Sequence, residues 1–144
     1  MAETKYGKYI ITEPKPHPSP PGVTVEDLGW EEVMRIDDEW LKGSFYLACV
    51  WIWKKAGDGS GIKPHVHDWD EYIGFFGTNP DDPKDLCGEI EFWLGDEKHM
   101  LTRSCVVFIP GGLQHCPIIT RRADRPIFSF STGPRSVYDK KTND

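Results

Sequence analysis

Short apolar segments, separated by glycine and proline, dominate the pattern of this chain. Residues 44–55 read SFYLACVWIWKK, a run rich in aromatic and β-branched side chains with helix breakers on both sides. Such a run is typical of a buried β-strand. The segments EYIGFFG at 71–77 and CVVFIP at 105–110 have the same character, and Pro110 ends the second one. The pattern therefore predicts strands in all three places.

The next strands are indicated by alternation. EIEFWL at 89–94 alternates apolar and other residues, and the GDEK that follows predicts a hairpin turn. Ile90, Phe92 and Leu94 are expected to face the core. PIITRRADRPIFSFSTG, residues 117–133, predicts two more strands around an RRADRP turn. Many short strands at close spacing predict an all-β sandwich or barrel.

The N-terminal third has a different pattern. KYIIT at 8–12 is a short strand candidate, and EPKPHPSPPG at 13–22 predicts an extended, proline-rich connector. Residues 24–41 look partly helical, so a short helix or helical turn is expected there.

These patterns divide the chain into three parts. We expect residues 1–43 to form an arm and connector that pack on the barrel, residues 44–134 to form the barrel, and residues 135–144 to form a flexible tail. The acidic segment 78–88 is expected to be a loop that shapes or covers a site entrance.

Composition and charge restrict the function classes. The chain has 144 residues, which fits one domain, and a net charge of −6 with a pI near 5.3. That acidity argues against nucleic-acid or membrane-surface binding, and no apolar run is long enough for a membrane span. A cytoplasmic location is the default expectation. The four cysteines include no CxxC pair and are expected to be free thiols.

Candidate metal ligands cluster in the stretch PHVHDWDEY at 64–72. If this stretch is a regular strand, then His65, His67 and Glu71 share a face, because alternate side chains point to the same side. Two imidazoles and one carboxylate make part of a coordination shell. His115 follows a tight PGG turn and is the best candidate for a further imidazole.

In these motifs the chain resembles the cupin superfamily. The first family motif is G(x)5HxH(x)3–4E(x)6G, and Gly59, His65, His67 and Glu71 fit it, with Gly77 one residue early.

The second family motif is G(x)5PxG(x)2H(x)3N. Pro110, Gly112 and His115 fit this motif, whereas Ser104 replaces the opening glycine and Ile119 replaces the final asparagine. The resemblance covers roughly residues 45–131. The two departures concern the turn and the strand exit rather than the four ligand positions.

The resemblance implies a double-stranded β-helix, or jelly-roll barrel, that holds one metal ion at its mouth. Carried over by position, the ligands would be His65, His67, Glu71 and His115. Three imidazoles and one carboxylate suit a divalent transition metal, which here could be Fe, Mn, Ni, Cu, Co or Zn. The resemblance also implies a homodimer, and the N-terminal arm could add a strand to a neighbour's sheet.

Several functions fit such a site. The leading hypothesis is an enzyme that acts on a small, oxygen-rich organic molecule. Dioxygenase chemistry is the first choice, because four protein ligands on an octahedral ion leave two adjacent positions. Isomerase, decarboxylase or lyase chemistry is an alternative. A non-catalytic module that binds a metal or a small ligand is another. The sequence assigns no acid–base residue.

Overall fold

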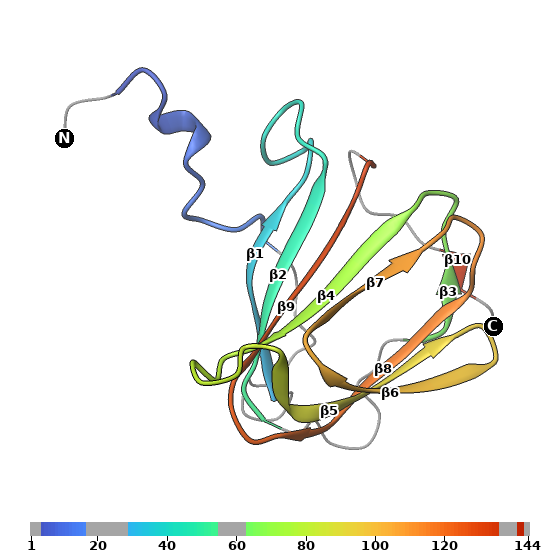
Figure 1. Ribbon diagram of the computed structural model, residues 1–144. Helices are drawn as coiled ribbons and strands as arrows, with labels where there is room; N and C mark the ends of the chain where they lie inside the picture. Colours follow the sequence, from blue (N-terminus) through green and yellow to red (C-terminus); the bar gives the residue numbers. More distant parts are fainter. Residues whose placement is uncertain (1–3, 17–28, 55–62, 136–140, 143–144) are drawn as a thin grey trace.

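The chain folds into two antiparallel β-sheets packed face to face (Figure 1). The structure is a computed structural model, and it describes residues 4–16, 29–54, 63–135 and 141–142. The only helical element in these ranges is a short 3-10 helix, η1 (Gly7–Tyr9). The predicted all-β jelly-roll fold is therefore confirmed.

Each sheet has five strands. The first sheet, in spatial order, consists of β1 (Trp30–Ile36), β2 (Tyr46–Ile52), β9 (Ile127–Gly133), β4 (Glu71–Gly77) and β7 (Cys105–Ile109). The second consists of β10 (Lys141–Thr142), β3 (His65–Val66), β8 (His115–Ala123), β5 (Asp85–Leu94) and β6 (Glu97–Arg103). Strands distant in sequence are neighbours in both sheets, so the chain passes repeatedly from one sheet to the other.

The hydrophobic core fills the space between the sheets. Ile90 and Phe92 are fully buried, and Leu94 packs against the same cluster, as the alternation predicts. Each such side chain contributes about 1.5–3 kcal/mol of hydrophobic free energy on burial. The other buried members are Ile52, Ile73, Phe75, Leu86, Ile109 and Ile127.

The helix expected at 24–41 is wrong for residues 30–36, although a single helical turn follows them, in which the Leu41 amide donates to the Asp37 carbonyl at 2.9 Å. Residues 30–36 form β1, which pairs antiparallel with β2 and has a register shift between Glu32 and Met34. Gly29 has a φ of 76°, which ends any helical path before the strand. Pairing with β2 satisfies the backbone of these residues, and this outweighs their local preference for helix. Residues 24–28 lie outside the described ranges.

The strand predicted at 8–12 is also wrong. Gly7–Tyr9 forms η1, in which the Tyr9 and Ile10 amides donate to the carbonyls of Tyr6 and Gly7. A Thr4 hydroxyl accepts from the Gly7 amide and closes the preceding turn. Figure 1 shows this arm leading away from the barrel beyond β1. The proposed division of the chain at residue 43 stays a prediction, although β1 is part of the first sheet.

Two further expectations need correction. The acidic loop is shorter than 78–88, because β5 begins at Asp85 and Leu86 is fully buried. The β7 segment is not buried on both faces, since Val106 and Phe108 are about half exposed at the edge of the first sheet.

Ser104, which replaces a family glycine, has a structural role. Its hydroxyl accepts from the Gly77 amide at 2.9 Å and donates to the Pro83 carbonyl at 2.7 Å, so it ties the 78–84 loop to the end of β4. Ile119, which replaces the family asparagine, lies within β8 and pairs with Glu91 of β5. Neither departure disturbs the strands.

An ion pair ties the N-terminal arm to the barrel. Lys15 Nζ lies 2.7 Å from Asp37 Oδ2, and the Asp37 carboxylate is 2% exposed. Burial alone would raise the pKa of Asp37. The Lys15 ammonium and the backbone amides of Glu39 and Trp40 outweigh burial, so this pKa lies below its usual value. The carboxylate is therefore held in its charged form.

Asp37→Asn is expected to lower the free energy of unfolding by about 2 kcal/mol at neutral pH, since it removes a charged hydrogen bond from a buried position. The folded-state pKa is depressed, so the difference from wild type should shrink as the pH falls through that pKa, below 3.8. Urea unfolding of both proteins at several pH values measures this difference in the free energy of unfolding. The control is Glu39→Gln, which removes the exposed arm of the same Lys15 pair and should cost under about 1 kcal/mol.

Candidate metal centre

The four predicted ligands come from three strands and one crossing segment. His65 on β3 is paired directly with His115 at the start of β8, so these two imidazoles belong to the second sheet. Glu71 is the first residue of β4, in the first sheet. His67 lies between them, outside any strand, where the chain passes from one sheet to the other.

The single regular strand expected over 64–72 is therefore wrong, because β3 ends at Val66 and β4 begins at Glu71. The ligands share a face for a different reason. The crossing segment bends around the mouth of the barrel, so side chains of both sheets point inward at the same place. Tyr72, the residue after Glu71, is half exposed and points away from the ligand side chains.

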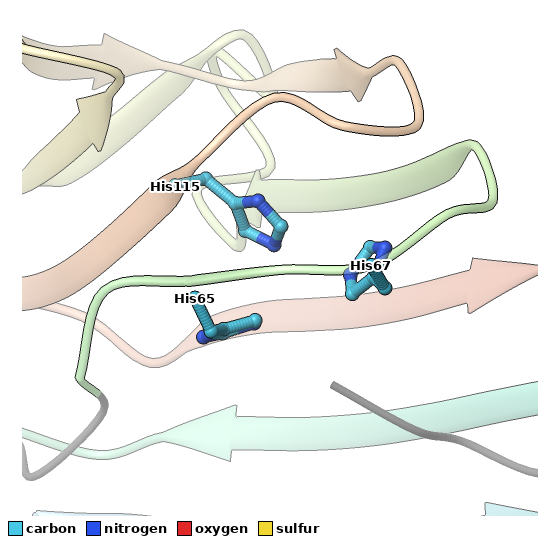
Figure 2. A group of neighbouring side chains, drawn as sticks. All are labelled: His65, His67 and His115. Atoms are coloured by element: carbon cyan, nitrogen blue, oxygen red, sulfur yellow. The ribbon is translucent and has the colours of Figure 1, made fainter. Parts of the chain in front are cut away.

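The four side chains meet in a buried cluster. The ligand nitrogens of His65, His67 and His115 all lie within 4.8 Å of one another, and Figure 2 shows the three rings grouped together. Glu71 Oε1 lies 3.0 Å from His67 Nε2 and 3.3 Å from His115 Nε2. None of the four residues is more than 3% exposed.

Backbone carbonyls orient all three imidazoles in the same way. The Nδ1 atoms of His65, His67 and His115 lie 2.8, 3.1 and 2.9 Å from the carbonyl oxygens of Lys63, Trp69 and Leu113. A carbonyl oxygen can only accept, so each Nδ1 carries the hydrogen. In the neutral ring, the lone pair is then on Nε2. This arrangement is the one by which proteins orient metal-ligating histidines.

The donor set fits a cation. In a neutral ring with its hydrogen on Nδ1, His67 Nε2 is an acceptor. Glu71 Oε1 is an acceptor too, yet these two atoms lie only 3.0 Å apart. Among the residues that the structure describes, His115 Nε2 is the one buried side-chain nitrogen or oxygen without a hydrogen-bond partner. Two ligand atoms at right angles on one ion, each about 2.1 Å from it, would be about 3.0 Å apart. A transition-metal ion would satisfy these lone pairs at once.

The second motif holds the first one in place. The Gly112 amide donates to the His67 carbonyl at 2.8 Å, and the Gly111 amide donates to Asp70 Oδ1 at 2.9 Å. Gly112 has a φ of 87°, which only glycine adopts readily. The turn before His115 is thus docked on the segment that carries His67, and the two parts of the site form one unit.

Sequence analysis assigned no role to Trp69, although its odd residue number would place it on the same strand face as the expected ligands. Its indole stacks on the His67 ring, with centroids 4.0 Å apart and planes inclined by 10°. Trp69 is also buried against Tyr46 and Ala48, a small cluster separate from the main core. The alternation of side chains along a strand was the one feature that could have drawn attention to Trp69. It does not distinguish a residue that stacks on a ligand from a core residue.

Other candidate residues lie elsewhere. Of the two remaining histidines, His99 is half exposed and pairs with Glu97 on β6, and His17 lies outside the described ranges. The four cysteines form no disulfide, in agreement with the expected thiols. Burial raises the pKa of the Cys49 and Cys105 thiols, which makes them inert packing residues.

Comparisons with solved structures show the fold of this chain. The chain has the cupin fold, and the resemblance seen in its sequence is confirmed at that level. No protein-family model and no curated protein sequence matches the chain. In the described residues, no helix is long and apolar enough to cross a membrane.

Three similar structures are enzymes with different reactions. The polyketide cyclase RemF from Streptomyces resistomycificus is 16% identical, with 80% of this chain and 70% of that chain covered. An oxalate oxidase is 14% identical, with coverage of 79% and 55%. A cupin sugar phosphate isomerase from Silicibacter pomeroyi is 18% identical, with coverage of 81% and 66%. Each has a TM-score of 0.50, so the likeness concerns the fold and leaves the reaction open.

Glu71→Gln and His115→Ala are each expected to lower the affinity for Co²⁺ or Ni²⁺ about tenfold or more, because each removes one lone pair or charge from the cluster. Equilibrium dialysis followed by mass spectrometry of the metal measures this. His99→Ala, a histidine outside the cluster, should bind as wild type does. Unchanged binding in both cluster variants would show that the ion is held elsewhere.

Proposed function

We propose that this chain is a mononuclear metal enzyme that acts on a small, oxygen-rich organic substrate. The supporting observation is the meeting of three buried, Nδ1-protonated imidazoles with the Glu71 carboxylate, including the partnerless Nε2 of His115. The proposed ligands are His65, His67, Glu71 and His115. When bound, a divalent ion from the group Fe, Mn, Ni, Cu, Co and Zn would supply Lewis acidity or electron transfer.

The residues of the chain determine which substrates suit the site. Three neutral imidazoles and one carboxylate around a divalent ion leave a net charge of about +1, so anionic substrates with neighbouring oxygens are favoured. A hydroxyl pair lies close to the site: the oxygens of Tyr46 and Ser131 are 2.6 Å apart, and the Tyr46 ring packs edge-on against Trp69. Burial raises the pKa of Tyr46 to about 12, so its phenol stays protonated and remains a hydrogen-bond donor.

Dioxygenase chemistry is the proposed reaction, because four protein ligands on an octahedral ion leave two adjacent positions for substrate and dioxygen. The purified protein should contain iron, and Fe²⁺-loaded protein should consume oxygen with a catechol, a diketone or a thiol. Metal mass spectrometry and an oxygen electrode measure these two quantities, with Glu71→Gln as the inactive control.

The other outcomes separate the alternatives. Tight zinc, nickel or manganese without oxygen uptake would favour isomerase, decarboxylase or lyase chemistry. A bound metal without turnover of any tested class would favour a binding module. Protein that binds none of these ions would contradict the proposal as a whole. A cytoplasmic location remains a prediction.

We also propose that the chain is a homodimer, formed through the outer face of the first sheet. Apart from Glu71, which points inward, strands β2, β9, β4 and β7 contain no charged residue. Their outward side chains form a connected aromatic network in which Trp51 stacks on Trp53 and contacts Phe128, and Phe76 stacks on Phe130.

The charge distribution favours a second copy as the partner. The chain carries a net charge of −6, so two copies repel each other. The repulsion at contact is smallest where the facing surfaces lack charge. The five most exposed members of the face expose roughly 400 Å² of apolar surface, about half of what one partner contributes to a standard interface. They are Trp53, Tyr72, Phe76, Val106 and Phe108. Because the arm forms η1, strand addition by KYIIT is not part of this proposal.

Multi-angle light scattering should give a dimer for the wild type and a monomer for the double variant Phe76→Lys/Phe108→Lys, since each protomer would place two ammonium groups in the interface and buried charges are costly. Met100→Lys is the matched control, because Met100 is equally exposed but lies on β6 of the second sheet. A wild-type monomer at high concentration, or a control that dissociates equally, would contradict the proposed interface.

A further inference from the structure

His67 is the one proposed ligand that no strand supports. His65, Glu71 and His115 lie on β3, β4 and β8, where the hydrogen-bond ladders fix the backbone. His67 lies in the crossing segment, and its carbonyl is held by the Gly112 amide. That bond positions the backbone of His67 but leaves the orientation of the ring to other contacts.

Trp69 contacts His67 at two points. Its carbonyl oxygen lies 3.1 Å from His67 Nδ1 and accepts the ring hydrogen. Its indole lies parallel to the same ring, with the centroids 4.0 Å apart. The first contact selects the tautomer, and the second restricts rotation of the ring about its side-chain bonds.

The indole also contacts the first sheet. A Cβ added to Gly133 would lie 2.2 Å from Trp69 Cζ3 and 2.4 Å from Cε3, so the indole rests directly on the backbone of β9. The φ of Gly133 is outside the left-handed region, so contact with Trp69 and the Asp70 carbonyl, rather than backbone strain, excludes a side chain here. Tyr46 closes the remaining side with an edge-on contact, at a centroid distance of 5.9 Å.

We infer that Trp69 is a positioning residue for the metal centre: through its contacts with both Gly133 and His67, which we call the clamp, it sets the direction of the His67 Nε2 lone pair. The inference rests on the proposed metal function. It assigns to Gly133, the last residue of β9, the task of leaving room for the clamp. The sequence motifs of the family assign a role to neither residue.

Gly133→Ala is the sharpest test, because it changes no ligand and forces the indole out of its present position. Affinity for Co²⁺ is expected to fall about tenfold, the low end of the effect of removing a partner that orients a ligand. The visible absorption of the Co²⁺ protein should shift as well, since it reports the directions of the ligands. Trp69→Leu, which removes the stack, should show the same two changes.

Gly74→Ala is the matched control. Its Cβ would lie 2.4 Å from Phe130 Cε1, so it also forces a methyl group against an aromatic ring of the first sheet, but on the outer face. It should lower the melting temperature as Gly133→Ala does and leave Co²⁺ affinity within twofold of wild type. If both glycine variants lose stability and both keep the wild-type affinity and spectrum, Trp69 is a packing residue only and the inference is wrong.

A double-mutant cycle isolates the indole. The methyl group of Gly133→Ala would also lie 2.8 Å from the Asp70 carbonyl oxygen. The effect of that contact persists when Trp69 is replaced by leucine. The loss of Co²⁺ affinity caused by Gly133→Ala should therefore be clearly smaller in the Trp69→Leu background than in the wild type. Equal losses in both backgrounds would overturn the inference.

A metal-free measurement separates this inference from the proposed function. Long-range ¹H–¹⁵N NMR spectra of the histidine rings should show Nδ1-protonated tautomers for His65, His67 and His115 in the wild type. In Gly133→Ala and Trp69→Leu, the signals of His67 alone should change. If those signals change but no ion binds, the clamp is real and the metal proposal fails; unchanged signals with normal binding contradict the clamp.

Discussion

The structure depends on one constraint, which is that the chain crosses from one sheet to the other between His65 and Glu71. A single strand would place these side chains in a row, about 6.8 Å apart at every second residue. The crossing instead wraps them around the barrel mouth and brings Glu71 Oε1 to within 3.3 Å of two imidazoles. A compact donor cluster therefore exists only because the segment is not a regular strand.

Burial divides the barrel interior into two zones. At one end, apolar side chains such as Phe75 and Phe92 form the main core and provide most of the stability. At the other end the interior contains polar groups, most of which bond to backbone carbonyls, hydroxyls or one another. His115 is fully buried in this polar zone. Its partnerless Nε2 is costly in the absence of a cation, which is why the site is interpreted as functional rather than as packing.

The two sheets differ in the charge of their outer faces. The first sheet presents a continuous aromatic face across four strands. The second has a charged outer face, where Arg121 and the Trp93 indole both bond to Glu91 and lower the pKa of its carboxyl. The proposed dimer uses the uncharged face and leaves the charged one exposed. The histidine cluster is buried between the two sheets.

The sequence by itself determined the all-β class, the alternation that buries Ile90 and Phe92, and the four side chains of the proposed centre, because ligand type and spacing are local properties. It misjudged residues 30–36, whose pairing with β2 outweighs their helical pattern, and it assumed a regular strand through His67. Only the tertiary structure decided which atoms meet: the Nδ1 bonds to carbonyls, the carboxylate across the mouth, and the indole of Trp69 on Gly133. The Nδ1 bonds join residues only two positions apart, but whether they form depends on the path of the folded backbone. The other two contacts join residues far apart in the sequence, and no local pattern encodes the distance between them.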